Sequence, residues 1–350
     1  MRRPADRPAA GLQRRAARNA SALAIGAAAL LLSLLADIGT GPGWLSPGEI
    51  LAALFAPSDQ DLRTAVIVWD IRLPVAAMAV LVGAMLGVAG AQMQTILGNP
   101  LADPFTLGIS SAASVGAAVA IVFGLGVAPV AGPLIVTTNA FVFAFVTALA
   151  IYALTRYRGV SPSTMILFGI ALMFTFNAIL GLLQYRASET QLAQIVFWMM
   201  GSLTRASWIK IAIGATLFAV LVPLMWRHRF ALTALRMGDD RAASFGVDVD
   251  RLRLQVLIQV ALLASTAVSF VGVIGFVGLV GPHIARLLVG EDQRWFVPLS
   301  ALCGALILSL TSIAAKNIVP GVIYPVGIIT ALVGVPFFIS LILNRRSYIA

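Results

Sequence analysis

Residues that could act as acids, bases or nucleophiles are scarce in this chain of 350 residues, which contains two His and one Cys. His228 and His283 lack the H-E-x-x-H spacing of zinc proteases, and no Lys lies in a G-x-x-x-x-G-K-[ST] loop that binds nucleotide phosphates. No His is placed to activate the hydroxyl of Ser202, a candidate intramembrane nucleophile. The single Cys303 cannot form an intrachain disulfide or a cysteine-based metal site. The sequence therefore predicts a chain that is not an enzyme and has no metal or cofactor of its own.

The 14 acidic residues avoid the middle of every long apolar segment, and Asp37 lies only at the end of the first one. Carriers driven by protons or ions use carboxylates inside the membrane as relays or ion ligands. Their absence favours a pore-forming subunit that another component powers, although sodium coupling through backbone carbonyls stays open. Two amides inside an apolar segment, Gln92 and Gln94, either line a pathway or bridge helices.

The composition indicates an all-α membrane protein. Hydrophobic residues make up 60% of the chain and charged residues only 11%, and the mean hydropathy is +0.96, whereas soluble domains carry about 25% charged residues. The net charge of +10 does not indicate a nucleic-acid partner, because the basic residues fall mostly between apolar runs instead of forming one folded patch.

A helix that spans a bilayer needs about 20 apolar residues, and the sequence predicts a bundle of about ten such helices. The predicted spans are residues 21–38, 74–97, 105–123, 134–154, 165–183, 209–225, 254–271, 276–289, 296–315 and 326–343. An amphipathic segment at 191–203 lies between the fifth and sixth. The first span has no clear cleavage site of the A-x-A type, which favours an uncleaved helix over a signal peptide.

Most of the 24 Lys and Arg residues fall in alternate connections, which places both termini in the cytoplasm by the positive-inside rule. This predicts a basic cytoplasmic tail at 1–19, a single transmembrane domain at 20–345 and a short cytoplasmic tail at 346–350. The long cytoplasmic loop 227–253 is predicted to form two short helices, broken at Gly238 and stopped at Gly246. A loop of this length in a compact membrane protein usually binds a partner.

The segment GNPLADPF at 98–105 predicts a firmly specified turn on the same side. Asn99-Pro100 and Asp103-Pro104 disfavour the α conformation before each proline, and Asp103 suits the N-cap of a helix that starts at Pro104. Small residues spaced for close helix packing precede this turn. They are Gly83, Gly87 and Gly90.

Several stretches together resemble the FecCD/BtuC-type permease family, the membrane subunits of ATP-binding-cassette importers for ferric siderophores, haem and vitamin B12. The matching stretches occur in the family's order at residues 71–74, 81–111, 198–203, 238–247, 275–308 and 324–338. The resemblance implies a type II importer fold with two such subunits, either two copies or two paralogues, around one path. It also implies two ATPase subunits, which bind ATP and Mg, and an extracytoplasmic substrate-binding protein.

The resemblance also assigns roles to particular residues. It places the coupling contact with the ATPases on Leu235, Arg236, Gly238, Asp239, Asp240, Arg241, Ser244, Phe245 and Gly246, with the charges at 239–241 facing the ATPase groove. It places docking of the binding protein on Arg72 and Lys316. It places the inner gate on the turn residues Asn99, Pro100, Asp103 and Pro104 and on Ser161, Pro162 and Ser163. This chain departs from the family at Val75, Ser312 and Ile323, where the family often has Arg, Asp and Glu.

The function expected from this resemblance is import of an iron chelate across the cytoplasmic membrane. A ferric siderophore is the first candidate, with haem and vitamin B12 as alternatives. A stand-alone carrier or channel is the remaining alternative of a different class.

Overall fold

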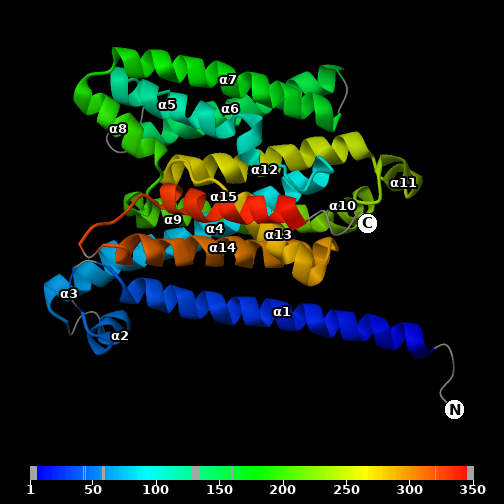
Figure 1. The fold of residues 1–350 in the computed structure, drawn as a ribbon, viewed down its shortest axis with the longest axis horizontal. Helices are drawn as coiled ribbons and strands as arrows, with labels where there is room; N and C mark the ends of the chain where they lie inside the picture. Colours follow the sequence, from blue (N-terminus) through cyan, green and yellow to red (C-terminus); the bar gives the residue numbers. More distant parts are fainter. Residues whose placement is uncertain are drawn as a thin grey trace.

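The computed structural model describes residues 6–41, 43, 45–56, 60–127, 134–158, 161–319 and 321–344. These residues form a helical bundle with no strand among them and a single isolated β-bridge between Val319 and Val322. Most of the long helices run along the long axis of the molecule (Figure 1). The expected all-α membrane fold is therefore confirmed.

The long helices are listed here in chain order. They are α1 (Asp6–Gly39), α4 (Leu73–Ile96), α5 (Ile109–Phe123), α6 (Leu134–Arg158), α7 (Pro162–Arg186), α9 (Trp208–Arg227), α12 (Val249–Val271), α13 (Val277–Val289), α14 (Gln293–Asn317) and α15 (Val326–Asn344). Shorter elements join them: α2 (Pro47–Phe55), α3 (Leu62–Val66), the π-helix η2 (Ile67–Arg72), the 3-10 turns η3 (Pro104–Leu107) and η4 (Leu203–Arg205), α8 (Glu189–Met199), α10 (Arg229–Leu235) and α11 (Asp239–Ser244).

Each of the ten predicted spans corresponds to one of these long helices. In the described part of the chain, seven helices are long and apolar enough to cross a membrane by themselves. Three shorter apolar helices complete the set: α5, α13 and the stretch Val326–Ser340 within α15. The short eighth span, expected from the sequence, is the 13-residue α13.

The first helix differs from its prediction. It begins at Asp6 and continues without a break to Gly39, so most of the predicted tail at 1–19 is helical. The tail is rich in Ala and Arg, which are among the strongest helix formers, and it contains no proline between Ala9 and Gly39. The helix of the first apolar segment therefore begins within the basic segment that precedes it.

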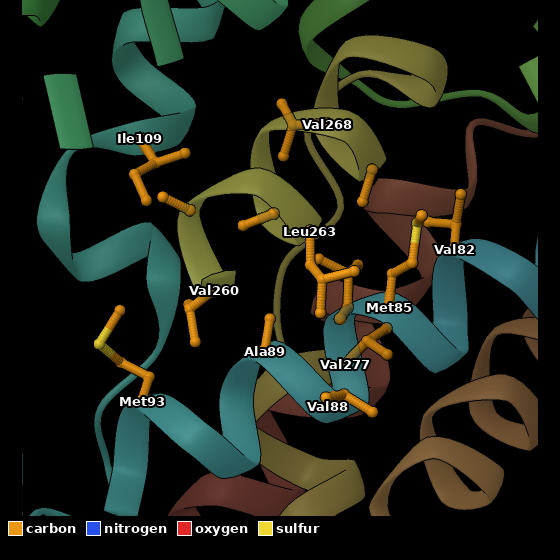
Figure 2. Close-up of a cluster of buried hydrophobic side chains, with 14 of the residues drawn as sticks. Val82, Met85, Val88, Ala89, Met93, Ile109, Val260, Leu263, Val268 and Val277 are labelled. Carbon is orange, nitrogen blue, oxygen red and sulfur yellow. The ribbon is translucent and has the colours of Figure 1, made fainter. Parts of the chain in front are cut away.

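Helix α4 forms the centre of the bundle and is buried along almost its whole length. Its contacts with α12 and α13 are aliphatic (Figure 2). The residues that meet there include Val82, Met85, Val88, Ala89, Val260, Leu263 and Val277. Lipid chains are as apolar as these side chains, so close van der Waals fit, rather than hydrophobicity alone, holds such helices together.

The three small residues of α4 permit that close fit. Gly83 and Gly87 lie against backbone carbonyls of α14, and Gly90 lies against the backbone of α13 at Gly278. A Cβ at any of these three glycines would overlap a carbonyl oxygen. Backbone contact at these points fixes the middle of α4 between α13 and α14.

The two ends of the bundle carry different elements (Figure 1). Helices α10 and α11 lie at the end where α1 begins and α15 ends, and this end is called the α11 end. Helices α2, α3 and α8 lie at the opposite end, which is called the α2 end. The residues with expected functions divide between these two ends.

Candidate functional site

The loop between α9 and α12 folds into two short helices, as its sequence predicts. Helix α10 ends at Leu235, and α11 begins after Gly238, whose φ of +105° is costly for any residue with a side chain. Leu235 is buried, whereas Met237 and Phe245 are exposed at 48% and 69%. Exposed apolar side chains on a short helical hairpin form a surface suited to a protein partner.

Two arginines attach this hairpin to the end of α4. Arg236, at the end of α10, donates from Nη1 to the carbonyl of Gln94 at 3.3 Å. Arg253, in the second turn of α12, donates from Nε to the carbonyl of Ile96 at 2.9 Å. The last four carbonyls of a helix have no partner within the helix, and they carry its negative dipole end. Arg253 therefore satisfies the Ile96 carbonyl, and Arg236 adds a second donor to the Gln94 carbonyl, which also accepts from the N–H of Asn99 at 3.2 Å.

Arg253 also binds the first residue of α11. Its Nη1 and Nη2 donate to the Asp239 carboxylate at 2.9 and 2.8 Å, a bidentate pair. The guanidinium is buried, whereas the Asp239 side chain is 51% exposed. Arg253 holds the Asp239 carboxylate within the chain, and the expectation that this exposed residue faces a partner's groove stays a prediction. Asp240 and Arg241 are exposed, as expected.

A second ionic group lies beside this pair. Arg236 also forms an ion pair with Glu291, in the turn between α13 and α14. Arg286 of α13 pairs with the same carboxylate at 3.1 Å and donates from Nη2 to the side-chain oxygen of Gln94. Gln94 donates in turn to the carbonyl of Gly278. These contacts join α10, α13 and α4 at one point.

Buried amides and hydroxyls extend the connection to α14. Gln92 donates to the side chain of Gln293 at 3.0 Å, and Gln293 donates to the Thr95 hydroxyl at 3.1 Å. The backbone N–H of Gln293 donates to the hydroxyl of Thr233 in α10 at 3.2 Å. Gln92 and Gln94 therefore bridge helices, which decides the alternative that the sequence left open.

This whole group of contacts forms the α4 joint. It comprises Gln92, Gln94, Thr95, the Ile96 carbonyl, Thr233, Arg236, Asp239, Arg253, Arg286, Glu291 and Gln293. Sequence reasoning missed most of it. A polar or charged side chain at the edge of an apolar span was the available signal, but this signal does not identify the partner.

The GNPLADPF turn follows directly from the α4 joint. The Asn99 side chain accepts from the N–H of Leu101 at 2.9 Å, and the Asp103 side chain accepts from the N–H of Phe105 at 2.9 Å. Pro104 opens the 3-10 turn η3, so the predicted N-cap is present. The third span nevertheless begins at Ile109 and not at residue 105, because Gly108 adopts φ +76° and redirects the chain between η3 and α5.

Asp103 is buried at this turn, and its carboxyl lies against Gly278 of α13. Burial raises the pKa of the Asp103 carboxyl to about 6, although the Phe105 N–H favours its charged form. The turn also packs on α7, where Gly108 approaches the carbonyl of Gly169. The turn therefore contacts α7 as well as α13.

The segment 161–163 begins α7. Ser161 is the N-cap and accepts from the N–H of Thr164 at 3.1 Å, and Pro162 occupies the first turn with Ser163. This is a stable helix start at the α11 end (Figure 1). A role for these residues as a gate stays a prediction.

At the α2 end, Arg72 and Lys316 line one cavity of about 450 Å³. Arg72 donates to the carbonyls of Ile38, Gly39 and Gly41 at 3.2 to 3.3 Å, and also to that of Gly43. Lys316 pairs with the buried Asp37 carboxylate at 2.7 Å. Both cations are therefore engaged within the chain, and their expected docking contact would require exchange of these bonds.

Ser312 belongs to the same cluster, since its hydroxyl donates to Asp37 at 2.9 Å. The expected family pattern has an acid in place of Ser312. Here the carboxylate at this point comes from Asp37 of α1. The Ser312 hydroxyl and the Lys316 ammonium therefore share one carboxylate oxygen of Asp37, which comes from a different helix.

Comparison with known proteins gives one consistent result. Residues 29–344 match the FecCD transport family. The chain is 37% identical to the hemin transport system permease of Yersinia pestis, over 80% of this chain and 84% of that one. It is 35% identical to the vitamin B12 import permease BtuC of Vibrio vulnificus, over 91% and 95%.

A solved structure agrees with these relatives. It is described as an inward-facing conformation of a transporter of the metal-chelate ABC type, and it superposes with a TM-score of 0.81. The two chains are 29% identical, and the match covers 92% of this chain and 98% of the other.

Proposed function

Because this chain belongs to the FecCD transport family and is a multi-pass permease subunit of an ATP-binding-cassette transporter, we propose that it imports an iron chelate across the cytoplasmic membrane. A ferric siderophore is the first candidate. In this proposal both termini face the cytoplasm, and a second permease subunit completes the path.

The observation that carries the proposal is the α4 joint. A subunit without its own phosphate-binding loop must receive its driving force through contact with another protein. The exposed side chains of α10 and α11 offer that contact, and the two arginines fix this hairpin to the end of α4. A displacement of the hairpin must therefore break these bonds or move α4.

The order of contacts along the chain supports one route for this displacement. Two ATPase subunits, which bind ATP and Mg, press on the surface around Met237, Asp240 and Phe245. Arg253 and Arg236 transfer the displacement to the last turn of α4. The GNPLADPF turn then carries it to α7 and α13. Packed helices of this kind change between discrete arrangements instead of deforming continuously.

A substrate-binding protein docks at the α2 end in this scheme. Acidic side chains of that protein would compete with Asp37 for Lys316 and with backbone carbonyls for Arg72. The bonds within the chain keep both cations in place until the partner arrives.

The relatives and one apolar surface support a bulky metal chelate as the substrate. The named relatives carry hemin and vitamin B12, which are large organic complexes of a metal. An open cavity of about 650 Å³ beside α15 is lined by apolar side chains such as Met199, Leu332 and Val335. Such a wall suits a bulky chelate held without specific polar contacts. Haem or vitamin B12 import by the same mechanism is the alternative.

The test is uptake into proteoliposomes that contain the full transporter. Each substrate is tested in a separate, matched reaction that includes the binding protein. We expect uptake of one ferric siderophore that requires both ATP and the ATPase subunits. Hemin and vitamin B12 are the comparison substrates, and preferred uptake of either would change the substrate assignment. An equal rate of uptake without the ATPase subunits would show a stand-alone carrier and refute the proposal.

A further inference from the structure

A second cavity at the α2 end is separate from Arg72 and Lys316. It has a volume of about 570 Å³ and lies between the outer parts of α5, α6, α8, α9 and α12. Its walls include Ile121, Val136 and Phe197, and two cations, Arg205 and Lys210, contribute to its lining. No Asp or Glu is among the described residues that line it.

The two cations lie close together. The Nζ of Lys210 donates to the backbone carbonyl of Arg205 at 3.1 Å. The Arg205 guanidinium lies 6.0 Å from the ring centre of Trp198 and donates from Nη2 to the carbonyl of Phe197 at 3.1 Å. Lys210 is only 8% exposed. These partners are neutral, so they orient the two charges without compensating them.

Neither cation forms an ion pair with an acid of the described residues. The Nη1 of Arg205 is buried and makes no hydrogen bond within that part of the chain. Lys210 also lies in the first turn of α9, where the helix dipole is positive and disfavours a cation. Buried charges are normally paired, because removing an unpaired charge from water is costly. No acid among the described residues therefore compensates the two cations of this cavity.

We propose that this cavity binds an anionic phospholipid, with the phosphate between Arg205 and Lys210 and an acyl chain along Ile121, Val136 and Phe197. The size of the cavity favours a lipid over a free ion. A water molecule occupies about 30 Å³ in the liquid, so a small inorganic anion leaves most of the volume and the apolar walls unfilled. The position beside the first turns of α6 and α9, which are membrane spans, gives a lipid direct access.

The proposal is independent of the transported substrate. Basic pockets between transmembrane helices are a known chemical environment for phosphate headgroups. The lipid would fill the gap between α8 and α9 and compensate both charges. It would thereby hold η4 and the start of α9 against α5 and α6.

The experiment measures lipid retained by the purified transporter. The complex is extracted in mild detergent, exposed to equal amounts of phosphatidylglycerol and phosphatidylethanolamine, and analysed by native mass spectrometry. We expect Lys210→Gln and Arg205→Gln each to retain about fivefold less phosphatidylglycerol than wild type, because each variant loses the attraction of one basic residue for the headgroup. Arg186→Gln is the matched control, because Arg186 is an exposed cation at the end of α7 outside the cavity. It should retain the wild-type amount.

Two further measurements address folding and the source of the phosphate. Lys210→Arg keeps the charge and should retain the lipid, so a loss confined to the Gln variants is due to charge. The wild-type protein, stripped of lipid, should unfold at a higher temperature after phosphatidylglycerol is added but not after inorganic phosphate is added. Equal retention by Lys210→Gln and wild type overturns the proposal. Stabilisation by inorganic phosphate equal to that by the lipid also overturns it.

Discussion

Replacement of Arg253 by Leu removes the most connected side chain of the α4 joint. The change deletes two hydrogen bonds to Asp239 and one to the carbonyl of Ile96. The bond to the buried carbonyl contributes about 1.5 to 3 kcal/mol, as a hydrogen bond to a charged group. The half-exposed Asp239 pair adds at most about 1 kcal/mol, because solvent screens it. The expected loss is about 3 kcal/mol of attachment between α11 and α4.

This loss should appear in coupling more than in folding, because the packing between α4, α12 and α14 is unchanged. We expect transport to fall tenfold or more, since each 1.4 kcal/mol is a factor of ten, while basal ATP hydrolysis by the assembled complex stays within about twofold. The assay measures substrate imported per ATP hydrolysed in proteoliposomes.

Two variants serve as controls for this prediction. Arg251→Leu removes an exposed arginine two residues away, whose side chain makes no hydrogen bond or ion pair with the described residues, and should leave the coupling ratio unchanged. Arg253→Lys keeps the charge but loses the bidentate geometry. Its ratio of substrate imported to ATP hydrolysed should lie between those of Arg253→Leu and wild type. If the well-folded Arg253→Leu complex imports as much substrate per ATP as wild type, the transmission through the α4 joint is refuted.

Three other perturbations test the remaining features. Gly87→Ala should cost about 1 to 3 kcal/mol in thermal unfolding, because its Cβ overlaps a carbonyl of α14, whereas Gly181→Ala on α7 meets nothing within 4 Å and should unfold like wild type. Asp37→Asn should destabilise by about 3 to 5 kcal/mol because it leaves Lys316 buried without its counter-ion, and a second change of Lys316 to Met should recover most of that loss. Because burial raises the pKa of Asp103 to about 6, the folded state binds more protons than the unfolded state between about pH 4 and 6. The free energy of unfolding should therefore fall by at most about 3 kcal/mol as the pH rises through that window. Asp103→Asn should abolish this part of the pH dependence, measured from unfolding midpoints at pH 4 and 7.

At both ends of the bundle, arginine side chains bind the carbonyls at the C-terminus of a helix. Arg72 binds the last carbonyls of α1, and Arg236 and Arg253 bind the last carbonyls of α4. Each arginine comes from another element, so these hydrogen bonds fix the end of the helix to a neighbouring segment. In the proposed mechanism, a partner protein competes for the arginine or pushes on the attached segment at such points.

The spans could be predicted from the sequence because a bilayer imposes a local requirement. Each helix needs a continuous run of apolar residues, and that run is visible without knowledge of the rest of the chain. The breaks at Gly238 and the cap at Asp103 could be predicted for the same reason, since they depend on bonds over a few residues. The α5 start shows where this reasoning ends: the cap was present, but the turn at Gly108 moved the helix start to Ile109.

The sequence by itself determined the membrane class, the order of the helices, the two short helices of the 227–253 loop and the family. Only the tertiary structure decided which polar groups meet. Arg253 and the Ile96 carbonyl are 157 residues apart, and Lys316 and Asp37 are 279 apart. The physical reason is that apolar runs, caps and proline breaks act locally, whereas a buried charge selects its partner only after the helices have packed.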